Sequence, residues 1–162
     1  MENNRKIQIR QSEPGDAGYV AFMHGRYYWK YHGFYEYAEY YFIKYLSDFV
    51  RDPTGGKLWV ADVDGTISGS IAIVRVDDDT AQLRWFIVEK ECQGMEIGGK
   101  LLKTALDFCR QSNYKTVFLW TFKGLDTAKH LYEKSGFVLT EEKPNNKWRS
   151  AEIIDRKMEL TL

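Results

Sequence analysis

The sequence predicts one domain of the mixed α/β class, the α+β type, in which four helices flank a central, mostly antiparallel sheet of about six to seven strands. Three observations predict it. The 162 residues have the length of one ordinary domain and show no linker or repeat. Hydrophobic residues are 44% and charged residues 28% of the chain, as in globular proteins. Apolar residues also switch repeatedly between alternating and helical spacing. We therefore assign residues 1–162 to a single domain.

The first half of the chain supplies one strand, two helices and a three-strand meander. Ile7 and Ile9 alternate with polar residues in a strand at 6–11, and the polar cluster at 12–16 favours a helix start. One helix is predicted to about residue 31, ended by Gly33, and a second from about 36 to 51. Turn residues at 64–65 and 77–79 separate strands predicted at 58–63, 66–76 and 81–89.

The second half alternates between helices and strands. An apolar stripe predicts a helix at 98–112, and residues 125–135, stopped by Gly136, predict another. Between them, the continuous apolar run 117–120 is typical of a strand that is buried on both faces. Two late strands are predicted at 137–140 and 150–160.

Charge and cysteine usage exclude several classes of function. The 23 basic and 23 acidic residues cancel, so bulk electrostatics favours neither nucleic acid nor a membrane surface as a partner. The sequence has no apolar run of the roughly 20 residues that span a bilayer, and its polar start lacks a signal-peptide core, so we expect a cytoplasmic protein. Cys92 and Cys109 lack the spacing of metal ligands, and we expect neither a metal site nor a disulfide framework.

The stretch from Gln93 to Lys100 carries the clearest functional signal. A strand leads into a glycine-rich loop, and a helix is predicted to begin at Gly98. A helix N-terminus presents unpaired backbone N–H groups, and glycines let a ligand approach them, so the pattern favours phosphate binding. It is not a P-loop, because Lys100 is not followed by Ser or Thr, nor a dinucleotide fingerprint, because a meander precedes it.

Two segments resemble the GCN5-related N-acetyltransferases, the GNAT family. The family's pyrophosphate loop reads Gln/Arg-x-x-Gly-x-Gly/Ala, and residues 93–98 fit five of its six positions, with Glu96 where the family has glycine. Residues 128–137 resemble the signature Ala-x-x-Leu-Tyr-Glu-Lys-x-Gly-Phe, although the Asn that often precedes it is Leu125 here. Weaker likeness elsewhere in the chain is similar to the acetyltransferase domains that are fused to MarR-type DNA-binding domains in bacteria.

The resemblance implies an N-acetyltransferase with acetyl-CoA as co-substrate, in which a primary amine of a small molecule or peptide attacks the thioester directly. It implies that backbone N–H groups of the strand before the loop hold the thioester carbonyl. Tyr132 becomes the candidate general acid for the leaving thiolate, and a core tyrosine is the alternative. The coenzyme contacts that the resemblance implies are Phe86, Ile87, Val88, Gln93, Gly94, Met95, Glu96, Ile97, Gly98, Gly99, Lys100, Tyr132 and Lys134.

The general base stays unassigned, because the strand at 83–88 carries no carboxylate. His24 is a candidate for that role, and a histidine that is satisfied within its helix is the alternative. Arg84 fits either a site for an acceptor's carboxylate or a buried ion pair with an acidic residue of the second helix. The aromatic residues between 27 and 49 fit either helix packing or an acceptor pocket. The candidate acceptor contacts are His24, Tyr28, Tyr31, Tyr35 and Arg84.

A second interpretation is a catalytically weak regulatory module that binds acetyl-CoA. Glu96, Leu125 and the missing strand carboxylate favour it over an enzyme. The sequence is compatible with a monomer or a homodimer, and it does not specify the acceptor.

Overall fold

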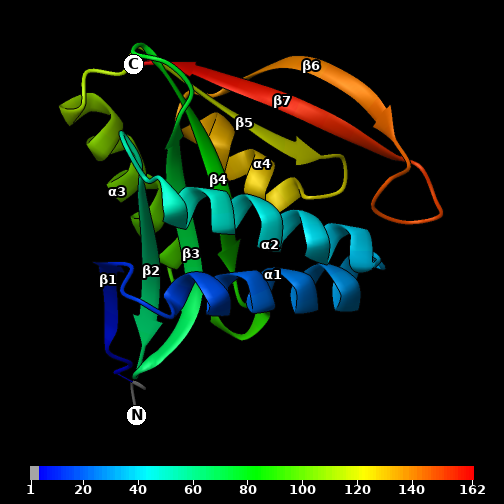
Figure 1. Ribbon diagram of the computed structural model, residues 1–162, viewed down its shortest axis with the longest axis horizontal. Helices are drawn as coiled ribbons and strands as arrows, with labels where there is room; N and C mark the ends of the chain where they lie inside the picture. Colours follow the sequence, from blue (N-terminus) through cyan, green and yellow to red (C-terminus); the bar gives the residue numbers. More distant parts are fainter. Residues whose placement is uncertain (1–3) are drawn as a thin grey trace.

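The computed structural model, which describes residues 4–162, has a seven-stranded sheet with helices on both faces (Figure 1). The strands lie in the order β1-β2-β3-β4-β5-β7-β6, and every neighbouring pair is antiparallel except β4 and β5. This confirms the predicted mostly antiparallel sheet. The strand bounds are Ile7–Gln11 (β1), Lys57–Val63 (β2), Thr66–Arg75 (β3), Thr80–Val88 (β4), Thr116–Phe122 (β5), Val138–Asn145 (β6) and Ile153–Thr161 (β7).

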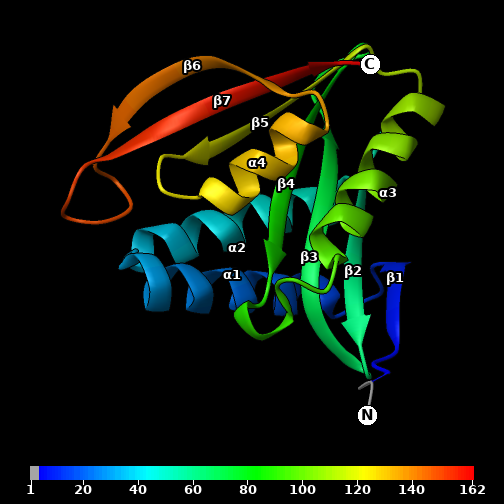
Figure 2. The ribbon, with the colours of Figure 1, turned by 180° about the vertical axis from the view of Figure 1, so that it is seen from behind.

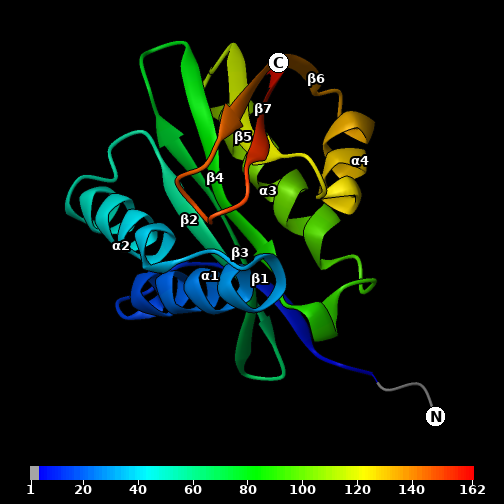
Figure 3. The same ribbon diagram turned by 90° about the vertical axis from the view of Figure 1, so that its right-hand side faces the viewer.

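Four α-helices cover the sheet. Helices α1 (Asp16–His32) and α2 (Glu36–Arg51) lie together on one face, whereas α3 (Ile97–Gln111) and α4 (Asp126–Lys134) lie on the other (Figures 2 and 3). Gly33 ends α1 as expected, because its φ of 67° permits a left-handed cap in which the N–H groups of Gly33 and Phe34 donate to the Trp29 and Tyr28 carbonyls. A short 3₁₀ turn, Lys90–Cys92, follows β4. No helix within residues 4–162 is both long and apolar enough to cross a bilayer.

Buried side chains form three clusters. The largest packs α3 and the inner side of α4 against the sheet, around residues such as Leu101, Leu119 and Met158. A second lies under α1 and α2 on the opposite face and includes Trp85. The third, around Phe34 and Ile153, joins the α1–α2 junction to the start of β7. The sheet is therefore buried on both faces at its centre.

Two strand predictions were wrong. The run at 117–120 does not mark a strand that is buried on both faces: Val117 and Leu119 are buried, whereas Phe118 and Trp120 are half-exposed and lie under the ammonium groups of Lys157 and Lys143. Strand β6 is longer than predicted. It is an exposed edge strand, so its second half shows no apolar alternation and contains a proline, and the sequence pattern therefore did not indicate it.

The position of the site follows from two irregularities of β4. Pairing with β5 runs only from Thr80–Thr116 to Gln82–Phe118, after which the two strands diverge (Figure 1). On the other edge, Ser70 pairs with Ile87 but Ala72 pairs with Arg84, so β4 holds one extra residue opposite β3. This bulge, with Trp85 at φ 47°, turns Trp85 into the cluster beneath α1 and α2.

Candidate active site

A cavity of about 790 Å³ opens where β4 and β5 diverge. One end is formed by the loop before α3, and the other is formed by residues of α1, α2, β5 and β7. Residues 82–88 of β4 run along its length, and their edge toward β5 has no strand partner in the described residues beyond Gln82. The cavity thus joins the predicted phosphate site to the aromatic segment of the first two helices.

The N-terminus of α3 forms the first end of the cavity. The N–H of Lys100 makes the first intrahelical bond, to Glu96, so the N–H groups of residues 97–99 precede the hydrogen-bonded part of the helix. A side chain at Gly98 would contact Leu131 and Phe86, whereas one at Gly99 would meet open space. Of the residues predicted to contact the coenzyme here, 93, 94, 96 to 99 and 134 line the cavity, whereas Met95 packs on the core and Lys100 is exposed to solvent off the cavity wall.

Glu96 shows why glycine is usual at its position. Its φ of 61° lies in the left-handed region, where a β-carbon costs roughly 1–2 kcal/mol and glycine costs nothing. The carboxylate is exposed, so it can turn away from a bound phosphate. The residue at this position thus adopts a conformation that suits glycine, and Glu96 adopts it at a cost in backbone strain.

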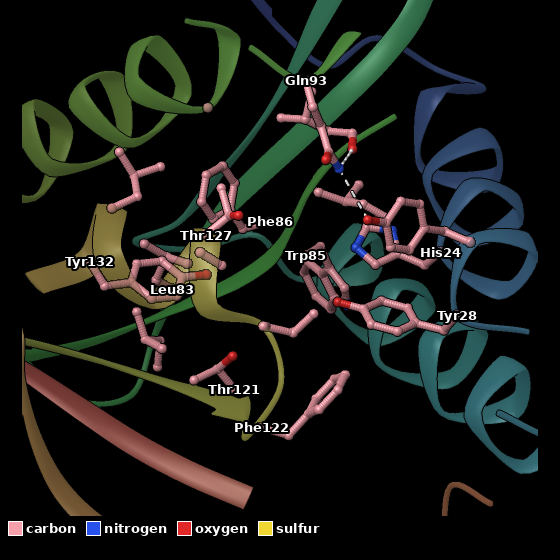
Figure 4. A pocket seen from close by; sticks show the side chains of 18 of the residues that line it. His24, Tyr28, Leu83, Trp85, Phe86, Gln93, Thr121, Phe122, Thr127 and Tyr132 are labelled. Carbon is pink, nitrogen blue, oxygen red and sulfur yellow. Dashed lines mark hydrogen bonds between the residues drawn. The ribbon is translucent and has the colours of Figure 1, made fainter. Parts of the chain in front are cut away.

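Gln93 fastens this loop to its surroundings. Its side-chain amide donates to the Tyr27 hydroxyl and to the Val88 carbonyl, each at 3.1 Å. The residue thus connects α1, the end of β4 and the loop, which is a positioning role as well as a place on the cavity wall (Figure 4).

Two phenols face the middle of the cavity from opposite sides. Tyr132 comes from α4, where its ring packs on Phe86 and Phe137, and Tyr28 comes from α1 beside Trp85 (Figure 4). Burial raises the pKa of both hydroxyls, and each is further raised by a neighbouring tyrosine, which for Tyr132 is Tyr28. The Tyr132 hydroxyl makes no hydrogen bond within residues 4–162 and is free to serve a ligand.

His24 and Trp85 place two unpartnered polar atoms beside these phenols. His24 is 2% exposed, and one ring nitrogen, Nδ1, lies 2.8 Å from the Val20 carbonyl, so Nε2 is left as an acceptor without a donor in the described chain. Burial lowers the pKa of His24 to about 4, which keeps the ring neutral. The Nε1–H of Trp85 is likewise buried and unpaired. Buried polar atoms of this kind normally find partners, so a ligand or water is expected here.

Arg84 lies on the cavity wall toward α2. Its guanidinium donates to the Tyr41 hydroxyl at 2.9 Å and lies over the rings of Tyr41, Tyr45 and Trp85. Burial lowers its pKa, and no carboxylate lies within 4 Å of it in the described part of the chain. The ion pair with an acidic residue of the second helix is therefore absent, and the aromatic rings of α2 take its place.

Aromatic residues enclose the second end of the cavity. Tyr28, Tyr31 and His32 line it as the α1 contribution, but Tyr35 does not: its ring is 50% exposed at the start of α2, outside the cavity. The prediction of an acceptor contact at Tyr35 is corrected accordingly. Burial lowers the pKa of His32, and the nearby cations Arg149 and Lys90 lower it further. Tyr41 and Phe42 of the aromatic segment at 27–49 also line this end, and lining residues that the sequence did not indicate include Thr121, Phe122, Trp148 and Asp155.

Asp155 is the notable omission among them. It sits half-buried on β7, accepts a hydrogen bond from the Asn145 amide at 2.7 Å, and has its pKa raised by burial. The available signal in the sequence was a carboxylate that directly follows two isoleucines in a strand. That pattern does not show that β7 lies near the cavity along β4. No cluster of three or more His, Cys, Asp or Glu that could hold a metal ion occurs in residues 4–162.

Curated relatives match part of this chain. A probable N-acetyltransferase camello of Xenopus laevis is 37% identical over 81 residues, which are 49% of this chain and 37% of that protein. The N-acetylaspartate synthetase of Danio rerio is 33% identical over 93 residues, 57% of this chain and 33% of that protein. The matched region thus spans only about a third of these relatives.

Solved structures share the fold across nearly the whole chain. Ard1 of Thermoplasma volcanium has a TM-score of 0.77 at 24% identity and covers 96% of this chain and 97% of its own. The structure of yncA from Salmonella typhimurium with its cofactor acetyl-CoA has a TM-score of 0.74 at 18% identity, with coverage of 96% and 94%. The family model described as Acetyltransferase (GNAT) family matches residues 21–137, well over half of the sequence. With the divergent strands and the helix-capped cavity, these matches show that the chain belongs to the acetyltransferase (GNAT) family.

Proposed function

We propose that this protein transfers the acetyl group of acetyl-CoA to a primary amine by direct attack on the thioester. The observation that carries the proposal is the single cavity in which the N-terminus of α3, the unpaired edge of β4 and the Tyr132 hydroxyl meet. The relatives named N-acetyltransferase and the structure of yncA with acetyl-CoA support the same reaction.

The residues of the first end fit the coenzyme. The free N–H groups at residues 97–99 and the positive end of a 15-residue helix suit a pyrophosphate, and Gly99 leaves room for it. The pantetheine arm would lie along residues 86–88, whose edge toward β5 has no strand partner and could take its amide hydrogen bonds. This orientation would bring the thioester toward Trp85, beside Tyr132 and Tyr28.

The reaction needs the amine as a neutral nucleophile. Its nitrogen forms a bond to the thioester carbon while the carbon–sulfur bond breaks, and the Tyr132 hydroxyl donates its proton to the leaving sulfur. Water then restores that proton. His24 can accept a hydrogen bond from the amine through Nε2, but a pKa of about 4 makes it too weak a base to hold the amine's proton, which we assign to solvent.

A thermal-shift titration tests the coenzyme site. Acetyl-CoA at 100 times its dissociation constant should stabilise the fold by about 2.7 kcal/mol, or roughly 5 to 10 °C, and ATP and NADH should not. Gly99→Asp should abolish the shift, because a carboxylate at the third position of α3 repels the pyrophosphate while suiting the helix dipole. Gly18→Asp, at the third position of α1, is the matched control and should keep it.

Thiol release in the presence of an amine panel tests the transfer. Turnover should fall at least about tenfold in Tyr132→Phe, with the acetyl-CoA shift retained, because only a transition-state interaction is removed. A shift without thiol release for any amine would instead identify the regulatory module, and the absence of a shift would sink both interpretations.

A further inference from the structure

We propose that the acceptor is a small amine that also carries a carboxylate, as an amino acid does, and that Arg84 binds this carboxylate within the aromatic end of the cavity. The inference rests on the proposed acetyl transfer and adds the class of acceptor to it.

The bulge in β4 determines where Arg84 lies. Leu83 and Phe86 both contact the cluster under α3 and α4, although they are three residues apart, because the extra residue places Arg84 and Trp85 together on the α1–α2 side. Counted from the loop at 93–98, Arg84 lies beyond Phe86 and Trp85. A coenzyme bound along residues 86–88 would end before Arg84, so the guanidinium is left for the acceptor.

The guanidinium is half-buried, and no carboxylate of residues 4–162 pairs with it. A guanidinium has five N–H donors, and the described residues supply one side-chain acceptor, the Tyr41 hydroxyl. Three aromatic rings hold its plane, with the Tyr45 ring centroid 4.7 Å and the Trp85 centroid 4.9 Å from Cζ. A half-buried cation gains from an anionic partner, and a fixed planar fork matches a carboxylate by two parallel hydrogen bonds. A ligand carboxylate would satisfy it.

Two other cations lie near this end. Arg149 donates to the His32 carbonyl at 3.2 Å but is not a lining residue, and Lys90, just after β4, lies over the Tyr31 ring. Arg84 is thus the arginine on the cavity wall. Asp155, the acidic lining residue there, is already bonded to Asn145, and the neutral His24 adds no competing cation. The amine of the acceptor can reach Nε2 of His24, which has no donor. The remaining walls are rings. The Tyr28 ring stacks on Phe42 with centroids 5.7 Å apart and lies tilted against Phe122 at 6.1 Å. They suit an acceptor with an apolar or aromatic body.

Pairs of acceptors that differ only in the carboxylate test this proposal on the unaltered protein. L-Phenylalanine is compared with phenethylamine and L-phenylalaninamide, and L-leucine with 3-methylbutylamine. We expect kcat/KM to be about 10- to 100-fold higher for the amino acids, the factor that corresponds to a hydrogen bond with a charged group. Equal or better use of the amines without a carboxylate would overturn the proposal while leaving acetyl transfer intact.

Variants assign the effect to Arg84. Arg84→Gln should lower kcat/KM for the amino acids to the level of the decarboxylated amines, Arg84→Lys should restore it in part, and all should keep the acetyl-CoA thermal shift. Arg110→Gln, an exposed arginine of α3 beside Asp107, is the control and should match the unaltered protein. An amino-acid preference that survives in a folded Arg84→Gln would contradict the assignment.

Binding without turnover separates the two proposals. In the presence of free CoA, L-phenylalanine should raise the melting temperature more than phenethylamine does. If no amine is acetylated but this difference is seen, the proposed reaction fails and the carboxylate site stands. If the difference is absent, the carboxylate site fails even where acetylation occurs.

Discussion

The fold keeps the His24 ring neutral, because burial lowers the pKa of the imidazole. In the unfolded chain its pKa is about 6.5, whereas burial lowers it to about 4 in the folded protein. Below pH 6.5 the unfolded chain therefore binds a proton that the folded protein refuses. Its contribution is a loss of stability as pH falls from about 6.5 to about 4, and the contribution is absent above that window.

The resulting prediction concerns the pH dependence of unfolding. Between pH 7 and pH 4, His24 should contribute a loss of roughly 3 kcal/mol in the free energy of unfolding. In His24→Leu this contribution should vanish, so denaturant titrations should show a shallower dependence on pH than in the unaltered protein. His130→Gln, at an exposed site, should keep the original dependence. Equal slopes in all three proteins would show that His24 is not buried as a neutral ring.

At the scale of elements, the bulge of β4 depends on one buried hydrogen bond. Ser70 is fully buried on β3, and its hydroxyl donates to the Trp85 carbonyl at 2.6 Å. That carbonyl belongs to the residue with φ 47°, so the bond holds the irregular turn of the strand. The positions of Arg84 and Trp85, and with them the aromatic end of the cavity, follow from it.

Ser70→Ala should therefore affect both stability and acceptor use. An unpaired buried carbonyl costs about 1–3 kcal/mol of unfolding free energy. The kcat/KM for the acceptor should fall by a larger factor than the melting-temperature shift caused by acetyl-CoA, because the loop at 93–98 does not rely on this bond. Ser68→Ala removes a local bond of 3.2 Å on the same strand and is the control. If both variants behave alike, the bulge does not depend on Ser70.

The elements also show how far the sequence could be read. All seven strands and four α-helices occur in the predicted order, with ends displaced by a few residues. Periodicity identifies α3 well, since its apolar stripe is the face that packs on the sheet. Periodicity fails for β6, an edge strand without a buried face. It also fails for the second face of β5, whose aromatic rings are covered by lysine side chains and not by a hydrophobic core.

On the scale of the whole molecule, one central sheet connects the clusters on its two faces. Each cluster contains or contacts a tryptophan: Trp59 lies in the cluster under α3, Trp85 in the one under α1 and α2, and Trp148 against the third. Strands β2, β3 and β4 contribute side chains to the clusters on both faces, so unfolding one cluster would expose apolar surface of the other.

We expect the chain to unfold as a single cooperative unit. Tryptophan fluorescence and far-UV circular dichroism should give one coincident transition in a denaturant titration, because the three clusters lose their support together. In Trp148→Phe, the midpoints measured by fluorescence and by circular dichroism should still coincide. Two separated transitions would divide residues 1–162 into independent units and contradict the single-domain prediction.

The sequence by itself determined the order of elements, the glycine-rich start of α3 and the position of Tyr132, because local periodicity and short motifs carry these features. Only the tertiary structure decided the composition of the aromatic end of the cavity. Arg84 meets Tyr41 across 43 residues, Asp155 reaches the cavity from β7, and Tyr35 turns outward although its neighbour Phe34 is buried. These contacts depend on how β4 bulges and diverges from β5, which is set by long-range pairing that no local pattern records.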